Sequence, residues 1–154
     1  MSVIVGNPPA ATTGTCELEI KADTATVWRA LTVETGQWWL KDYYSRENAV
    51  FRIEAKLGGR MYEDQGHGNG LIWGQVIGVD PEKSLDIQTY LTQDFGGPAI
   101  SYLAIRLEPL KGATKIILTD TLFGFPAPKT AGNMEAGWVQ LLKEGLKDYV
   151  EKVA

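Results

Sequence analysis

The sequence predicts an α+β fold in which a curved antiparallel sheet of about seven strands wraps around a long C-terminal helix. Between residues 49 and 122, apolar side chains recur at every second position in short runs separated by turn-forming residues, which is typical of strands. From about Thr130 to Val153 they recur at intervals of three and four, which predicts an amphipathic helix. Each element has one apolar face, so each can cover the other, and a strongly curved sheet can leave a cavity between them.

The first part of the chain predicts one strand followed by two short helices. Residues 15–21 alternate in polarity and form the strand, and residues 22–32 form a helix for which Asp23 is a suitable N-cap. The apolar side of that helix consists of Val27, Trp28 and Leu31. The aromatic-rich residues 37–44 form the second helix.

Six further strands are predicted before the final helix. They span residues 49–54, 60–64, 71–80, 84–91, 100–108 and 114–122. Residues 93–98 form a loop, and residues 123–133 break all regularity. The apolar stripe of the final helix consists of Met134, Trp138, Leu141, Leu142, Leu146, Tyr149 and Val153.

Length and composition fit one domain with a real core. The chain has 154 residues, of which 44% are hydrophobic, and its five Trp, six Tyr and four Phe can fill a core or line a cavity. We expect residues 1–14 to form a flexible N-terminal tail and residues 15–154 to form the single domain.

Charge and cysteine content limit the classes of partner and the cellular location that the sequence predicts. The net charge is −4 and no run of basic residues occurs, so we expect neither nucleic acid nor an anionic membrane as a partner. The one cysteine excludes an internal disulfide, and neither a signal-peptide pattern nor an apolar run long enough to span a membrane is found. These features predict a cytoplasmic protein without a membrane span.

The glycine-rich residues 57–74 predict turns rather than a phosphate or metal site. The run Gly-His-Gly-Asn-Gly over residues 66–70 lacks dinucleotide-binding spacing and precedes a strand, not a helix. The only histidine, His67, and the only cysteine, Cys16, are too few and too far apart in sequence to predict a zinc site. We therefore predict no metal and no cofactor, and a solvated loop position for His67.

Several segments together resemble one known family. They are "ADTATVWRALT", "LGGRMYEDQGHGNGLIWGQVIGVDPEKSLDI", "GGP", "GATKIILTDTLFGF" and "GWVQLLKEGLKDYVE". Over residues 15–152 the chain resembles the SRPBCC, or START-like, superfamily, and within it the branch named after the activator of heat-shock-protein-90 ATPase homologue. The resemblance implies a helix-grip fold with an internal cavity. It also implies binding of lipids, sterols, polyketides or other hydrophobic molecules, which some members cyclise or hydrolyse.

Asp120 is the most informative polar residue in the sequence. It shares the apolar face of strand 114–122 with Ile116, Leu118 and Leu122. A carboxylate there would face the cavity or a buried partner, and burial would raise its pKa. It would then orient a ligand or act as a general acid or base; the alternative is a solvated strand end or a cap on the following loop.

Other candidates for the cavity follow from the same alternation. Glu63 shares a face with Met61, and Gln75 shares one with Trp73 and Ile77. Aromatic residues, Tyr149 among them, could surround a ligand or belong to an ordinary core. The predicted cavity lining consists of Trp39, Tyr43, Met61, Glu63, Trp73, Gln75, Leu118, Asp120, Met134, Trp138 and Leu141.

The function that these observations favour is binding of a hydrophobic or aromatic small molecule or a lipid in the cavity. An enzyme of the cyclase or hydrolase kind is the first alternative, with Asp120, Glu63, His67 or a tyrosine as the acid or base. No Gly-x-Ser-x-Gly motif occurs, and no catalytic residue can be assigned. The second alternative, taken from the family name, is a module that binds a chaperone and activates its ATPase.

Overall fold

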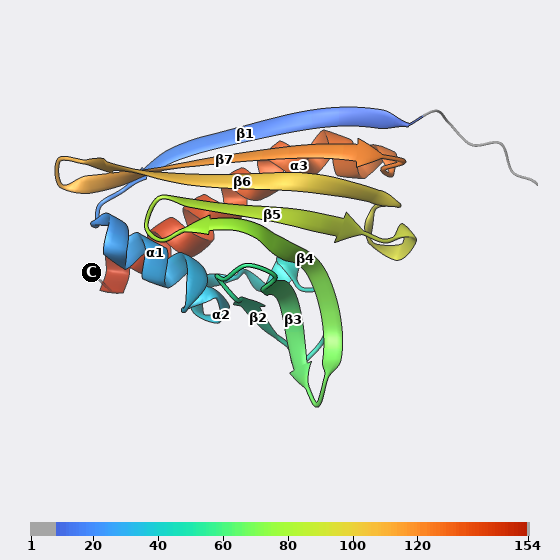
Figure 1. Cartoon of the computed structure of the whole chain (residues 1–154), viewed down its shortest axis with the longest axis horizontal. Coiled ribbons are helices and arrows are strands. Elements are labelled where there is room, and N and C mark those ends of the chain that lie inside the picture. The colour runs from blue at the N-terminus through green and yellow to red at the C-terminus, as the bar shows by residue number, and fades with distance from the viewer. Residues whose placement is uncertain (1–8, 154) are drawn as a thin grey trace, which may run out of the picture.

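The sheet is antiparallel throughout, and its strand order places the first strand beside the last. The computed structural model describes residues 9–153, and the order across its seven-stranded sheet is β1-β7-β6-β5-β4-β3-β2 (Figure 1). The strands are β1 (Ala10–Ile20), β2 (Val50–Ile53), β3 (Arg60–Gly66), β4 (Asn69–Asp80), β5 (Ser84–Leu91), β6 (Ala99–Leu110) and β7 (Ala113–Gly124). The predicted α+β fold is confirmed.

Strand β1 starts earlier than the alternation of its side chains suggests. Each residue from Ala10 to Ile20 pairs with β7, so residues 10–14 belong to the sheet, and the prediction that they form a flexible tail is wrong. Their small and polar side chains carry no strand period, but their main chain completes the hydrogen-bond ladder of β7. The rest of the predicted tail, except Pro9, lies outside the described residues.

The two helices after β1 lie at one end of the long C-terminal helix. Helix α1 (Thr24–Thr32) begins at the predicted cap, because the Asp23 carboxylate accepts a hydrogen bond from the Thr26 amide at 2.8 Å. The predicted second helix is instead split into α2 (Thr35–Trp38) and a short 3-10 turn, η1 (Lys41–Tyr43). The break falls at Trp39, whose backbone is extended.

The glycine-rich segment forms turns, as predicted. His67 and Gly68, between β3 and β4, both have positive φ angles, of 57° and 77°. Such a pair is the centre of a type I′ hairpin turn, whose twist matches that of the flanking strands. His67 is exposed at the tip of this hairpin.

A long C-terminal helix crosses behind the sheet and ends beside α1 (Figure 1). It consists of α3 (Pro128–Gln140), a π-helical segment η3 (Leu141–Lys147) and α4 (Asp148–Val153). No residue of α3 is fully buried, whereas η3 buries Leu141, Leu142, Gly145 and Leu146. The helix is thus packed tightly on the core along its second half only.

The π-helical segment changes which face of the last turns is buried. Val150 is buried and Val153 is 62% exposed, so the predicted placement of Val153 in the apolar stripe is wrong. A π-helical turn contains more residues than an α-helical one, and the buried positions therefore continue as Leu142, Leu146 and Val150, spaced by four.

Within residues 9–153, no helix is long and apolar enough to cross a bilayer.

The tight half of the helix depends on a close approach at Gly145. A Cβ atom there would lie 2.8 Å from the Trp38 carbonyl oxygen and 3.1 Å from its ring carbon Cε3. Trp38 cannot easily move away, because it is buried and its indole N–H donates to the Ala30 carbonyl at 2.7 Å. Glycine is therefore required where the helix meets α2.

Replacing Gly145 by Ala is expected to lower the free energy of unfolding by roughly 1–3 kcal/mol through overpacking. Urea denaturation measures this change. Gly132→Ala is the matched control, since Gly132 lies in the same helix and a Cβ atom there would meet no neighbouring atom within 4 Å. The control is expected to be neutral or to stabilise by up to about 1 kcal/mol. Equal effects of the two substitutions would contradict the close-approach argument.

Candidate functional site

A cavity of about 290 Å³ lies between α3 and the inner face of the sheet. Helix α3 and the start of η3 form one wall, strands β2 to β7 form the opposite wall, and residues from the segment around η1 close one side. The lining residues are Trp39, Tyr43, Phe51, Met61, Trp73, Thr89, Leu91, Ser101, Asp120, Leu122, Thr130, Asn133, Met134, Gly137, Trp138 and Leu141. The walls are predominantly apolar and aromatic.

The structure brings most of the predicted lining residues together. Those that line the cavity are Trp39, Tyr43, Met61, Trp73, Asp120, Met134, Trp138 and Leu141. Three predicted residues do not line it. Leu118 is buried in the main hydrophobic core. Glu63 is buried on the inner face of the sheet but is enclosed by its own hydrogen-bond partners, and Gln75 is exposed, as described below.

Sequence reasoning missed several lining residues for two different reasons. Thr89 and Ser101 lie on the inward side of their strands, in step with Ile87 and Leu103, so extending the alternation to polar residues would have found them. The residues Thr130, Asn133 and Gly137 belong to α3, which begins at Pro128, within the segment predicted to be irregular. They are polar or have no side chain, so the apolar period that marks Met134 and Trp138 in the same helix does not mark them.

Gln75 is exposed, and the expectation that it shares a face with Trp73 is wrong. Met61 pairs with Gly74 while Tyr62 pairs with Ile72, so Trp73 is an extra residue in β4. This β-bulge shifts the alternation by one position. Trp73 still faces inward, but Gln75 and Ile77 after the bulge face solvent.

Aromatic rings form a rigid wall at one side of the cavity. Trp39 stacks on Phe51 with ring centroids 3.6 Å apart and planes 8° from parallel. Trp138 meets Trp39 edge to face at 6.3 Å, and the Tyr43 hydroxyl donates to Gln140 at 2.6 Å. These contacts hold the rings in place, so the wall is formed before any ligand arrives.

A row of polar side chains crosses the inner face of β5, β6 and β7. Thr89 and Ser101 lie opposite each other, and their hydroxyl groups are hydrogen-bonded. Asp120 follows on β7, where its Oδ2 accepts a hydrogen bond from the indole N–H of Trp138 at 2.9 Å. Its other oxygen, Oδ1, is buried and has no hydrogen-bond partner among the described residues.

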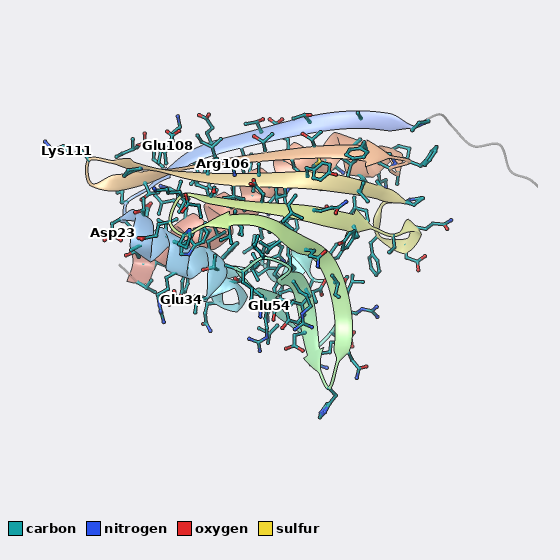
Figure 2. All side chains as sticks on the ribbon, viewed as in Figure 1. Asp23, Glu34, Glu54, Arg106, Glu108 and Lys111 are labelled. Atoms are coloured by element: carbon teal, nitrogen blue, oxygen red, sulfur yellow. The ribbon has the colours of Figure 1, made fainter. Side chains whose placement is uncertain are left out.

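The surroundings of Asp120 disfavour its charge. The residue is only 6% exposed, and this burial raises the pKa of its carboxyl above the ordinary value, while the nearby Ser101 hydroxyl and the hydrogen bond from Trp138 oppose the rise. Among the described residues, no Lys, Arg or His lines the cavity. In Figure 2, Lys111 at the turn between β6 and β7 and Asp23 at the start of α1 lie at the outer edge of the view.

Glu63 is also buried, but its carboxylate is fully used by the protein. It accepts hydrogen bonds from the Ser45 amide at 2.9 Å, the Ser45 hydroxyl at 2.6 Å, the Arg46 amide at 2.8 Å and the Trp73 indole at 2.6 Å. Glu63 thus fixes Trp73 and ties the segment after η1 to β3. It has no oxygen left for a ligand.

The other residues considered for a catalytic, metal-binding or ligand-binding role do not line the cavity. His67 is exposed, and Cys16 is buried in β1, where burial raises the pKa of its thiol. The Tyr149 hydroxyl donates to Glu34 at 3.2 Å. Within residues 9–153, no three His, Cys, Asp or Glu side chains are grouped so that they could hold a metal ion.

Comparisons with known proteins identify relatives of the same fold. The family model described as "Activator of Hsp90 ATPase homolog 1-like protein" matches residues 21–151. A search of curated proteins finds no match.

Among solved structures, protein MLL2253 from Mesorhizobium loti has a TM-score of 0.70 and 22% identity, covering 92% of this chain and 98% of its own. The Aha1 dimer from Colwellia psychrerythraea has a TM-score of 0.63 and 20% identity, covering 91% and 96%. DynU16, a protein of the dynemicin biosynthetic locus, has a TM-score of 0.63 and 20% identity, covering 90% of this chain and 47% of its own. At these identities the likeness extends to the fold alone.

Asp120→Asn removes the ionisation while keeping an acceptor for Trp138. Since the pKa of the carboxyl is raised in the folded state, ionisation penalises folding as pH rises from the ordinary pKa of 3.8 through the folded value. The stability of the variant relative to the native chain should therefore increase as the pH rises from about 3.5 to about 7. Urea denaturation at both pH values measures the difference, and a pH-independent difference would contradict the argument.

Glu63→Ala leaves two main-chain N–H groups, a hydroxyl and the Trp73 indole without their acceptor. We expect the free energy of unfolding to fall by about 3 kcal/mol, and tryptophan emission to change because Trp73 loses its anchor. Glu108→Ala serves as the control, since Glu108 is exposed on the outer face of β6 and should change stability by less than about 0.5 kcal/mol. Similar losses in both variants would refute the anchoring role of Glu63.

Proposed function

The chain belongs to the family of activator of Hsp90 ATPase homolog 1-like proteins, and from this premise we propose that it binds a small, largely apolar aromatic molecule in the cavity beneath α3. The observation that carries this proposal is the cavity of about 290 Å³, walled by Trp39, Trp73 and Trp138. Protein interiors are close-packed, so an apolar space of this size in a small domain calls for an occupant.

The size and polarity of the cavity support a small ligand. Its volume lies near the lower end of the range for pockets that hold small molecules, roughly 300–1,000 Å³. The polar row of Thr89, Ser101 and Asp120 lies on one wall and the aromatic rings lie on others. This division suits a ligand with an apolar body and one polar group.

The construction of α3 supports the same proposal. None of its residues is fully buried, although Met134 and Trp138 face the cavity. A bound ligand would cover these side chains and would gain roughly 25 cal/mol for each Å² of apolar surface removed from water. The occurrence of a protein of this fold in the dynemicin biosynthetic locus is compatible with a small-molecule role.

A second function, catalysis, has one specific observation in its favour. Asp120 and Ser101 both line the cavity, and the raised pKa of the Asp120 carboxyl suits a general acid or base. Turnover of a bound ligand that stops in Asp120→Asn while binding persists would favour this alternative. Activation of a chaperone ATPase is supported only by the family name. A cytoplasmic location remains part of the proposal.

Filling the cavity is expected to weaken binding without unfolding the protein. Gly137 lines the cavity on α3, and a Leu side chain there would extend into the space that a ligand needs. Calorimetric titration with naphthylmethanol should show one site per chain in the native protein and a loss of affinity of about tenfold or more in Gly137→Leu.

Gly132→Leu makes the same change on the same helix outside the cavity and should bind as the native chain does. Thermal unfolding of both variants verifies that they fold. Equal binding by the two variants would place the naphthyl group elsewhere and contradict the proposed function.

A further inference from the structure

We propose that the ligand is an amphipathic amine, whose protonated amino group pairs with Asp120 while its apolar body contacts the aromatic walls. The inference rests on the proposed function and names the ligand class of the same cavity. Its starting point is the unpartnered oxygen of Asp120, which is buried and belongs to a residue only 6% exposed.

The negative charge in the cavity wall favours a ligand with a positive charge. Asp120 is the one Asp, Glu, Lys, Arg or His among the lining residues, so its carboxylate has no countercharge in the cavity wall. An isolated buried carboxylate is costly, and a cation that pairs with it removes part of this cost. An anionic ligand would increase the cost.

A comparison with Glu63 shows that the lack of hydrogen-bond donors is specific to the Asp120 carboxylate. Both carboxylates are buried on the inner face of the sheet, and each accepts a hydrogen bond from a tryptophan indole. Glu63 accepts three further hydrogen bonds from Ser45 and Arg46, whereas Asp120 Oδ1 accepts none. The fold therefore satisfies all the oxygens of one carboxylate and leaves Oδ1 of the other without a partner in the wall of the cavity.

The neighbours of Asp120 fit an ammonium group better than a hydroxyl. An ammonium has three donors and no acceptor, and the polar row offers three acceptor oxygens: Asp120 Oδ1 and the hydroxyls of Ser101 and Thr89. In the strand register, Ser101 lies diagonal to Asp120 and directly opposite Thr89. An alcohol has one donor and would leave part of this set unused.

The aromatic walls favour the same class. A cation within about 6 Å of an indole face is attracted by the ring, and this attraction grows when water is excluded. Trp138 contributes both to the wall and to the hydrogen bond on Asp120 Oδ2, so the charged and aromatic parts of the site are adjacent. Trp39 meets Trp138 edge to face beside them.

Three probes with one aromatic body and different charges test the inference. They are naphthylmethylamine, naphthylmethanol and naphthoate, titrated by calorimetry near neutral pH, where the alkylamine is protonated. On the native chain, the amine should bind about tenfold or more tightly than the alcohol, and naphthoate should bind most weakly.

Asp120→Asn should bring the amine and the alcohol to within about threefold of each other. Asp86→Asn is the matched control, because Asp86 lies on the outer face of β5 and pairs with Arg106 there at 2.7 Å. It should leave the native order of the three probes unchanged. The tenfold preference, its loss in Asp120→Asn and its retention in Asp86→Asn would together support the inference.

An amine that binds no more tightly than the alcohol, or a preference that survives in Asp120→Asn, would overturn the inference. In that case, alcohol binding that is lost in Gly137→Leu would still support the proposed function of the cavity. If none of the three probes binds the native chain, both the amine inference and the proposed aromatic ligand are overturned.

Discussion

The arrangement of the whole molecule depends on how closely the C-terminal helix approaches α2 at Gly145. There the helix backbone packs directly against Trp38, and the neighbouring side chains of η3 are buried in the core. The other half of the helix, α3, contacts the rest of the molecule mainly along its edges. The Thr130 hydroxyl donates to the Gly96 carbonyl at 2.9 Å, and Gly14 of β1 leaves room for Met134 and Glu135. A helix fixed closely at one end and only at its margins at the other leaves a space above the middle of the sheet.

The same part of the molecule is incomplete in packing and in hydrogen bonding. The cavity lies beneath α3, and the one unpartnered buried side-chain oxygen found in the described residues, Asp120 Oδ1, belongs to its wall. Elsewhere the rules of protein interiors are followed, as the four hydrogen bonds to Glu63 illustrate. Natural proteins concentrate such departures at functional sites, because stability is given up where a ligand must be accommodated.

The fold supplies the cavity, whereas individual side chains decide what enters it. Structures with 20–22% identity share the sheet and the long helix with this chain, so the backbone arrangement tolerates extensive sequence change. The aromatic wall of Trp39, Phe51 and Trp138 and the hydrogen bond to Asp120 depend on individual side chains and not on the backbone arrangement alone. The proposed function therefore rests on these residues and does not follow from the fold.

Local patterns in the sequence determined the strands, the Asp23 cap, the hairpin turn at His67 and the inward direction of Asp120. Each of these depends on a residue and its near neighbours, whose periodicity or hydrogen bonding is visible in the sequence. Tertiary structure alone decided that residues 10–14 join the sheet, because β7 provides their partners from more than a hundred residues away. It also decided that Gln75 faces solvent, since the bulge at Trp73 arises from pairing with β3. The existence of the cavity has the same origin: a period tells which face of a helix is apolar, but only packing against Trp38 sets how far that face stands from the sheet.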